Sequence, residues 1–232
     1  MIPKEELTIM KRSEINRAVR EFRAALDAIF FRLPPFCDFP AEAWKTLGHE
    51  YDEIRERMLG WDITDFGSGD FLHTGLQLVT IRNGNPDDPA SKTYAEKIML
   101  VRENQVTPIH FHWYKMEDII NRGGANLAVR VWLADEDEGL SDADVPVTMD
   151  GVTRTVPAGT VLSLKPGESI TMQRRLYHTF WGEGGDAVVG EVSMCNDDEH
   201  DNRFLVPCGR FAAIEEDEAP EYLLCNEYPP AP

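Results

Sequence analysis

Apolar residues recur at intervals of three and four along the first part of the chain. This spacing predicts an amphipathic helix with one apolar stripe. The stripe consists of Ile15, Ala18, Val19, Phe22, Leu26, Ile29, Phe30 and Leu33. Ser13 is a suitable N-cap, and Pro34 and Pro35 are expected to end the helix.

A second helix is predicted from about residue 40 to residue 59. Its inner face would carry Trp44, Leu47, Tyr51, Ile54 and Met58. Gly60 would supply the C-terminal cap, since glycine readily adopts the left-handed conformation that ends many helices. The simplest interpretation is that both helices pack on the main domain or on a partner subunit.

The pattern changes from about residue 71 to short β-rich runs bounded by turn residues. These runs cover residues 76–81, 97–102, 126–132, 161–164, 169–172 and 187–194. Asp150-Gly151 lies between two alternating segments, which indicates a hairpin. Short strands without intervening helices predict an antiparallel sandwich or barrel. We therefore expect a helical extension over residues 1–65, packed on a β-domain over residues 66–232 as one structural unit.

Composition narrows the function classes. The chain has 232 residues and a net charge of −18, which disfavours binding to nucleic acid. It contains no apolar run of about 18 residues, so a membrane protein is not expected, and its first residues do not resemble a secretory signal. The four cysteines lie far apart without a Cys-x-x-Cys motif. They are expected to be reduced thiols, which favours a cytoplasmic location.

The strongest chemical signal is a metal-ligand pattern around residue 112. His110 and His112 are alternate residues of a short strand, so both side chains project to the same face. Glu117 follows after a spacing that allows a turn to bring its carboxylate back to the imidazoles. This donor set suits manganese, iron, cobalt or zinc. His178 is the best candidate for a fourth ligand.

The same residues carry a family resemblance. The pattern His-x-His-x4-Glu-x6-Gly, which ends at Gly124, resembles the first motif of the cupin superfamily. Pro157-Ala158-Gly159 and Pro166-Gly167 before His178 resemble the second motif, with a longer spacing than usual. Within the cupins the chain is most similar to the D-lyxose isomerase family. The matching segments are residues 11–16, 96–105, 110–124, 191–194 and 196–198.

This resemblance implies a cupin barrel, a double-stranded β-helix or jelly roll, with added N-terminal helices. It also implies a homodimer and a metal-dependent aldose–ketose isomerase that converts D-lyxose to D-xylulose and also D-mannose to D-fructose. Manganese is the expected metal, with cobalt, iron and zinc as alternatives. Two open coordination positions would hold neighbouring sugar oxygens, and a base would move a proton between C1 and C2 through a metal-bound cis-enediol. The sequence leaves a hydride shift open.

The catalytic residues are assigned with the help of the resemblance. Glu117 is expected to act in catalysis as well as in metal binding, and Lys97 to contact the substrate. The family uses an acidic residue beside the metal for proton transfer, and Glu215 is our prediction for it, with Glu191 and Glu216 as alternatives. Lys115 and Asp118 are interpreted mainly as surface residues or supports of the ligands. Asp197, Asp198 and Arg203 would bind sugar hydroxyls or form a loop, and Trp113 and Trp181 would face the sugar or pack in the core.

Two other functions fit the same ligands. The first is a cupin dioxygenase with iron bound by three histidines and a glutamate, because metal availability helps to decide which metal such a site takes. The second is a sugar-binding cupin without catalytic activity. His49, His73 and His200 are expected to lie outside the metal site, with His73 the best candidate for an exception.

Overall fold

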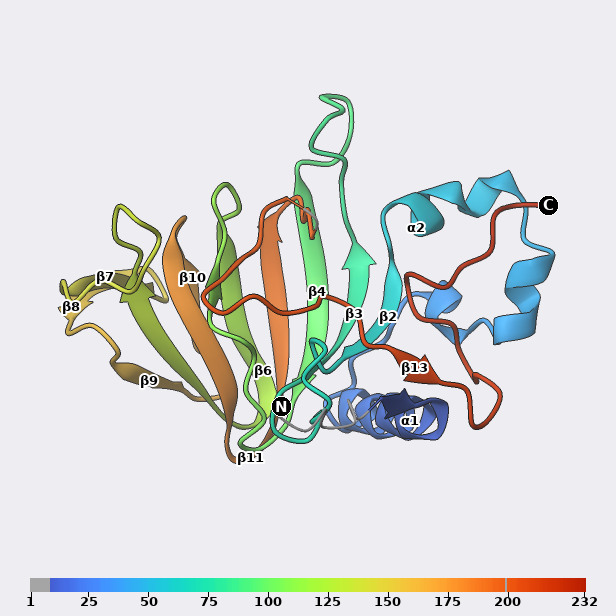
Figure 1. Ribbon diagram of the computed structural model, residues 1–232, viewed down its shortest axis with the longest axis horizontal. Coiled ribbons are helices and arrows are strands. Elements are labelled where there is room, and N and C mark those ends of the chain that lie inside the picture. Colours follow the sequence, from blue (N-terminus) through green and yellow to red (C-terminus); the bar gives the residue numbers. More distant parts are fainter. Residues whose placement is uncertain (1–8, 199) are drawn as a thin grey trace, which may run out of the picture.

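The computed structural model describes residues 9–198 and 200–232. Strands dominate, so the prediction of a mainly β protein is confirmed. In the described part of the chain, no helix combines the length and apolar character needed to cross a membrane. Figure 1 shows a broad sheet with the helices and the C-terminus at one side.

The first helix, α1 (Arg12–Ala28), buries the predicted apolar stripe from Ile15 to Leu26. It ends earlier than the expected stop at Pro34 and Pro35, because Phe30 adopts a positive φ, and the Phe30 side chain is 83% exposed. Its inner residues pack against outward-facing side chains of the main sheet, which include Trp61, Val79, Ile98 and Val188. Ser13 does not cap the helix, which begins one residue earlier at Arg12. The Ser13 hydroxyl instead donates to the carboxylate of Asp217 at 2.7 Å, so the start of α1 is held by the C-terminal segment.

The prediction of a continuous helix from residue 40 to residue 59 is wrong. The structure has two 3-10 helices, Ala41–Lys45 and His49–Tyr51, and a five-residue helix α2 (Asp52–Glu56). A further 3-10 helix, Pro35–Asp38, precedes them. Gly48 is extended and interrupts the helical path. Arg55 donates to the carbonyl oxygens of Leu47 and Gly48, which gives these groups partners outside a helix.

The main sheet contains eleven strands. Eight of them form the path β2-β3-β4-β11-β6-β10-β7-β8, while β5, β9 and β12 pair at its sides. Their bounds are β2 (Gly60–Thr64), β3 (Leu76–Arg82), β4 (Tyr94–Val101), β5 (His110–Phe111), β6 (Glu117–Leu133), β7 (Val145–Met149), β8 (Val152–Val156), β9 (Val161–Leu164), β10 (Ser169–Met172), β11 (Leu176–Met194) and β12 (Arg203–Phe204). Because β2 pairs with β3, the sheet already includes residues before the expected boundary at residue 65.

Two long strands, β6 and β11, carry the sheet around the core. The first half of β6 pairs with β10 and its second half with β9. One half of β11 pairs with β5 and the other with β4. Apolar side chains from both halves, such as Ile119, Val129 and Val189, meet in one buried cluster. Polar side chains among these inward positions therefore face the same interior, which is where a site can form.

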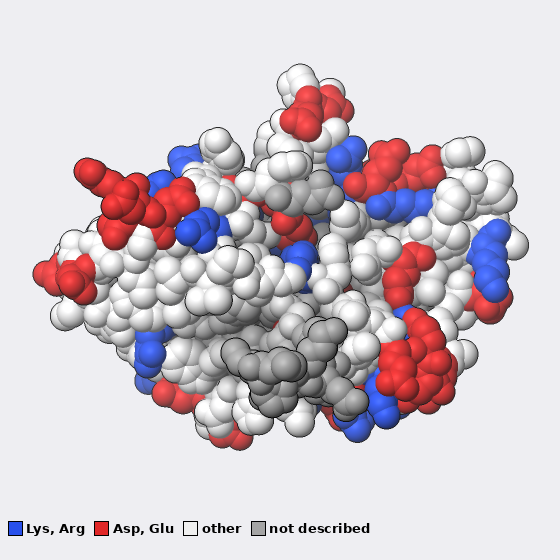
Figure 2. All heavy atoms as spheres, viewed as in Figure 1, with Lys and Arg blue, Asp and Glu red and all other residues white. Residues whose placement is uncertain are grey.

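The predicted hairpin is confirmed, because β7 and β8 pair in antiparallel register around Asp150 and Gly151. Both turn residues have positive φ, as a tight two-residue turn between twisted strands requires. After β11 the chain crosses in front of β11 and β6 (Figure 1), pairs with β5 through β12, and then reaches α1. There β13 (Ile214–Glu215) pairs with β1 (Met10–Lys11). Figure 2 shows acidic and basic atoms together in a depression near the centre of this face.

Candidate active site

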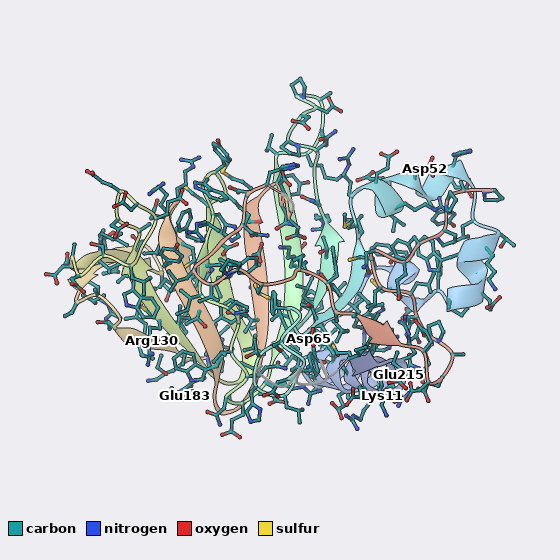
Figure 3. All side chains as sticks on the ribbon, viewed as in Figure 1. Lys11, Asp52, Asp65, Arg130, Glu183 and Glu215 are labelled. Carbon is teal, nitrogen blue, oxygen red and sulfur yellow. The ribbon has the colours of Figure 1, made fainter. Side chains whose placement is uncertain are left out.

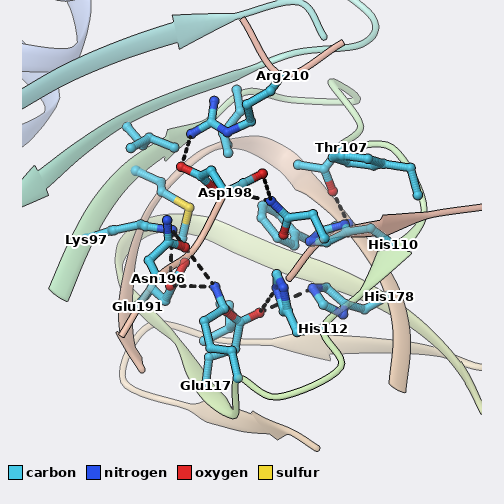
Figure 4. Close-up of a pocket in the computed structure, with 18 of the residues that line it drawn as sticks. Lys97, Thr107, His110, His112, Glu117, His178, Glu191, Asn196, Asp198 and Arg210 are labelled. Atoms are coloured by element: carbon cyan, nitrogen blue, oxygen red, sulfur yellow. Dashed lines mark hydrogen bonds and ion pairs between the residues drawn. The ribbon is translucent and has the colours of Figure 1, made fainter. Parts of the chain in front are cut away.

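Three histidines and one glutamate converge where β5, β6 and β11 meet. His110 on β5 and His178 on β11 are direct cross-strand partners. His112 follows β5, and Glu117 is the first residue of β6. The His110 ring centroid lies 4.3 Å from that of His178 and 5.2 Å from that of His112. The structure therefore brings together the four residues that the sequence predicted as metal ligands (Figure 4).

Each imidazole is oriented by a backbone carbonyl. The Nδ1 atoms of His110, His112 and His178 lie 2.9, 2.9 and 3.0 Å from the carbonyl oxygens of Pro108, Asp201 and Leu176. A carbonyl oxygen only accepts, so Nδ1 must carry the proton and Nε2 is left with a free lone pair. This is how metal-binding histidines are usually held.

The free nitrogens face one another and a carboxylate. One ring nitrogen from each histidine lies within 4.8 Å of the other two. Glu117 Oε1 lies 3.3 Å from His178 Nε2 and 3.6 Å from His112 Nε2. His178 Nε2 is buried and makes no hydrogen bond with the described residues. Lone pairs that converge without a proton between them repel, and a divalent cation would remove this repulsion, so these residues fit a metal ion.

The environment keeps the ligands in the protonation states that a metal needs. Burial lowers the pKa of His110 well below its usual range, and the neighbouring imidazoles lower it further. Burial also lowers the pKa of His112, with the charge of Lys115 as the next cause. Burial alone would raise the pKa of Glu117, but Lys115 and the imidazoles bring it well below its usual range. Neutral imidazoles at His110 and His112 and an ionised carboxylate at Glu117 result.

Lys115 is buried beside Glu117, so of its two interpretations, a surface residue or a support of the ligands, its position matches the second. Its Nζ lies 2.7 Å from Glu117 Oε2 and 3.1 Å from Glu191 Oε1. Burial alone would lower the pKa of this ammonium, yet the two carboxylates raise it. Lys115 therefore remains charged and links the metal-ligand cluster to a second carboxylate.

Glu191 is the centre of this second group. It points inward from β11 and is 5% exposed. The ammonium of Lys97 on β4 lies 3.4 Å from Glu191 Oε1 and donates to Asn196 Oδ1 at 2.6 Å. Lys97, which is expected from the sequence to contact the substrate, lines the pocket that contains the three histidines and Glu117. Asn196 also accepts from Lys115 at 3.3 Å, so two lysines share an amide oxygen and a carboxylate.

A third polar group lies across the pocket from Glu117 and His112 (Figure 4). Arg210 Nη2 donates to Asp62 Oδ2 at 2.6 Å and to Asp198 Oδ2 at 3.1 Å. Asn202 Nδ2 donates to Asp198 Oδ1 at 3.3 Å. Burial alone would raise the pKa of Asp198, but Arg210 and Lys97 lower it strongly. Asp198 is therefore ionised and firmly held.

The formal charges that line the pocket balance. Three carboxylates, from Glu117, Glu191 and Asp198, stand with three cationic side chains, from Lys97, Lys115 and Arg210. The remaining lining is largely apolar. With neutral imidazoles the lining carries no net charge, so a bound divalent ion would make it positive. Such a pocket would favour a ligand that develops negative charge on oxygen.

The other acidic residues considered from sequence lie elsewhere. Glu215 is exposed on β13, beside Lys11 at the α1 side of the molecule (Figure 3). Glu216 is bound to Arg12. Neither residue lines the pocket. Within this chain, Glu215 is therefore not placed to exchange a proton with a molecule bound beside the three histidines and Glu117.

Most of the remaining candidates are also explained by local contacts. His49, His73 and His200 are exposed and pair with nearby aspartates, as expected for histidines outside the metal site. Trp113 donates to Glu138, and Arg203 pairs with the same glutamate. Trp181 lies outside the pocket against Arg130. Asp118 is exposed and accepts from Thr171.

Sequence reasoning missed three features of the pocket. Arg210 follows a glycine in a segment without a periodic pattern, and nothing local marks it as buried. Lys115 appears beside the metal motif but has no spacing that signals burial. Phe66 lines the pocket with a positive φ, which a non-glycine residue rarely adopts. The Asp65 carboxylate, which accepts from the amides of Gly67 and Gly69, holds this turn, and Asp-Phe-Gly is its only local signal.

The lowered pKa values of His110 and His112 predict how the metal-free protein responds to acid. Below the ordinary imidazole value of 6.5, the unfolded chain takes up protons that the folded protein does not. The free energy of unfolding should then fall by about 1.4 kcal/mol per pH unit for each imidazole that stays neutral. Thermal unfolding in chelator at pH 7.5, 6.5 and 5.5 measures this. His110→Gln should show a shallower decline, and an unchanged midpoint between pH 7.5 and 5.5 would contradict the prediction.

Comparisons with known proteins agree on one enzyme family. The sequence model of the D-lyxose isomerase family matches residues 10–228. The D-lyxose/D-mannose isomerase of Serratia proteamaculans is 50% identical over 223 residues, which cover 94% of this chain and 98% of the relative. The enzyme of the same name from Escherichia coli O157:H7 is 49% identical, with the same coverage.

Solved structures with a similar fold are also sugar isomerases. L-ribose isomerase from Cellulomonas parahominis, determined with L-ribose, has a TM-score of 0.61 and 17% identity, and the match covers 90% of this chain and 100% of that chain. L-ribose isomerase from Acinetobacter sp. DL28 with L-ribose has a TM-score of 0.58 and 16% identity, with coverage of 90% and 99%. At these identities the likeness shows the fold alone.

Proposed function

Because the chain belongs to the D-lyxose isomerase family, we propose that it interconverts D-lyxose and D-xylulose, and D-mannose and D-fructose. The observation that carries this proposal is one buried pocket that holds two separate acidic groups. Glu117 lies among three imidazoles, and Glu191 lies beside two lysines. An aldose–ketose isomerisation needs such a division, because one group must polarise the carbonyl while another moves the proton.

His110, His112, His178 and Glu117 would hold the divalent metal. A metal bound there would supply a Lewis acid that draws electrons from a carbonyl oxygen and stabilises negative charge on oxygen. Manganese is our first expectation, because a carboxylate with imidazoles suits it, and cobalt, iron and zinc can use the same donors. Lys115 keeps Glu117 ionised and fixes one of its oxygens, which leaves the other facing the imidazoles.

We propose Glu191 as the residue that carries the proton between C1 and C2. Among the carboxylates that line the pocket, Glu117 would bind the metal, and Asp198 is paired with Arg210. One oxygen of Glu191, Oε1, lies near the ammonium groups of both Lys97 and Lys115. The two lysines stabilise the carboxylate through this oxygen, and no described residue holds both of its oxygens. Proton removal from one carbon and return to the next by a single carboxylate gives a cis-enediol intermediate.

Lys97 and Asn196 would position the sugar for this transfer. The Lys97 ammonium lies beside Glu191 and carries three donors, of which Glu191 and Asn196 take two. The third is available for a sugar hydroxyl next to the reacting carbons. Proximity of this kind keeps the carbon-bound hydrogen within reach of the carboxylate during the reaction.

We also propose a cupin barrel, a homodimer and a cytoplasmic location. The bent sheet around one core supports the first. Tyr94, Val192 and Met194 are 48, 44 and 42% exposed on the outward side of β4 and β11, which supports a contact with a second copy. All four cysteines are free, as expected for reduced thiols in a cytoplasm. Analytical ultracentrifugation of the wild type and of Met194→Lys tests the dimer.

The reaction is tested with D-lyxose in heavy water, followed by proton NMR. We expect formation of D-xylulose with solvent deuterium at C1, and loss of this activity after treatment with a chelator. Addition of manganese should restore it. Turnover that a chelator does not affect would contradict the proposal, and oxygen consumption would favour the dioxygenase alternative. Complete retention of a deuterium label from substrate C2 would indicate a hydride shift in place of the enediol.

A further inference from the structure

The reacting carbons of D-lyxose do not distinguish it from its epimer L-ribose. The two sugars have the same configuration at C2 and C3 and differ only at C4, and D-mannose shares the configuration of D-lyxose at all three carbons. A site that acts at C1 and C2 therefore needs a separate group, beyond the reacting carbons, to select between them. This inference rests on the proposed function and concerns where that selection takes place.

The pocket has one pair of charged side chains that the proposed chemistry does not use. When C1 and C2 lie at the metal-binding residues and Glu191, the rest of the sugar extends into the remaining lining. The charged side chains there are Arg210 and Asp198, which lie across the pocket from Glu117 (Figure 4). Apolar residues such as Met99 and Phe204 supply much of the remaining surface and cannot read a hydroxyl configuration.

This distal pair is rigidly built. Arg210 Nη2 bridges Asp62 and Asp198, and the carbonyl oxygen of Arg210 accepts from the Thr64 hydroxyl at 2.8 Å. The Cζ atom of Arg210 lies over the ring of Phe211, 4.8 Å from the ring centroid, and this contact helps to fix the plane of the guanidinium. Arg210 Nη1 is buried and donates to no described residue, so a donor is left for a ligand. A fixed donor beside a fixed acceptor can discriminate between two positions of one hydroxyl.

We propose that Arg210, together with Asp198, reads the C4 hydroxyl and selects the D-lyxose configuration over that of L-ribose. The Arg210 guanidinium would donate to this hydroxyl and Asp198 would accept from it. In the epimer the hydroxyl points away from the pair, and both charged groups lose a ligand partner. Hydrogen bonds that involve a charged group are strong enough for this to give a selectivity of about 10- to 100-fold.

The experiment compares kcat/KM for D-lyxose and L-ribose in the manganese-loaded wild type, Arg210→Lys and Asp198→Asn. Arg210→Lys keeps the positive charge beside Asp62 and removes the planar guanidinium with its several N–H donors. Asp198→Asn removes the carboxylate and keeps Arg210 paired with Asp62. We expect the ratio of the two values to fall by about tenfold or more in each variant. Because both sugars are measured on the same preparation, the ratio does not depend on the folded fraction.

L-glyceraldehyde provides the control substrate, since it has the C2 configuration of D-lyxose and ends at C3, without a C4 hydroxyl. Its kcat/KM should change by less than about threefold in both variants, as the residues at C1 and C2 are untouched. An unchanged D-lyxose to L-ribose ratio in both variants would overturn the inference, and so would an equal loss on all three sugars. A wild type without activity on D-lyxose would instead overturn the proposed function, which is a separate result.

Discussion

Replacement of Glu117 by glutamine is expected to remove the bound metal and to lower kcat/KM for D-lyxose by about 10³-fold or more. Glu117 is the anionic member of the cluster, and its Oε1 lies 3.3 Å from His178 Nε2. An amide in its place has no charge to offer a cation, and it leaves the buried ammonium of Lys115 without a partner 2.7 Å away. Metal content by mass spectrometry and steady-state kinetics with added manganese measure the two effects.

Asp118→Asn is the matched control for this change. Asp118 is the next residue on β6, and its side chain points outward. The substitution Asp118→Asn therefore removes one negative charge from the same strand, as Glu117→Gln does. Metal content and kinetics should stay at wild-type values in this variant. Circular dichroism and a thermal melt show whether Glu117→Gln is folded, since the loss of a buried ion pair also destabilises the protein. A folded Glu117→Gln protein with full metal content and activity would contradict the assignment.

The metal cluster could be predicted because its signal is local. His110 lies on β5 and His112 directly follows this strand, and their alternate positions in an extended segment place both side chains on one face. Glu117 needed only a short turn, which the structure has between β5 and β6. His178 lies far along the chain, and its approach depends on the register between β5 and β11. A spacing rule does not give this register, and the choice of His178 was helped by the resemblance to the second cupin motif.

From the sequence, the proton carrier that we propose, Glu191, was only an alternative to Glu215, for a related reason. The sequence offers many acidic residues, and the acidic run around Glu215 stands out in composition. Composition does not tell which carboxylate is buried. Glu191 alternates with Val189 and Ser193, so its inward direction was predictable, but its two lysine partners come from β4 and from the turn before β6. Only tertiary packing brings these three segments together.

The helical region shows the same limit in the fold. The stripe of α1 repeats over several turns and was predicted correctly from Ile15 to Leu26, although the helix ends at Ala28 and not at Pro34. The stretch around Gly48 has apolar residues at helical spacing as well, yet it forms short turns. Its backbone carbonyls are satisfied by Arg55, a partner that periodicity does not reveal. Periodic burial is thus a reliable signal only where the backbone has no alternative partners.

Glu191→Gln is expected to lower kcat for D-lyxose by about 10²- to 10⁴-fold and to leave metal content unchanged. The amide retains an oxygen that can accept from Lys97 and Lys115, so the local contacts are kept. It cannot take a proton from carbon, and so solvent deuterium should enter C1 at a rate reduced by the same factor. Kinetics, metal analysis and deuterium incorporation on one preparation separate this result from a loss of folding.

Two further variants decide between the acidic residues. Glu183→Gln changes an exposed residue of the same strand, β11, and should leave kcat at the wild-type value. Glu215→Gln tests the assignment made from sequence, and because Glu215 is exposed on β13 we expect no change in kcat there either. A Glu191→Gln protein with kcat within about threefold of the wild type would contradict our proposal. A large loss in Glu215→Gln would return the proton-transfer role to the C-terminal segment, which would then have to reach a pocket from the far side of the sheet.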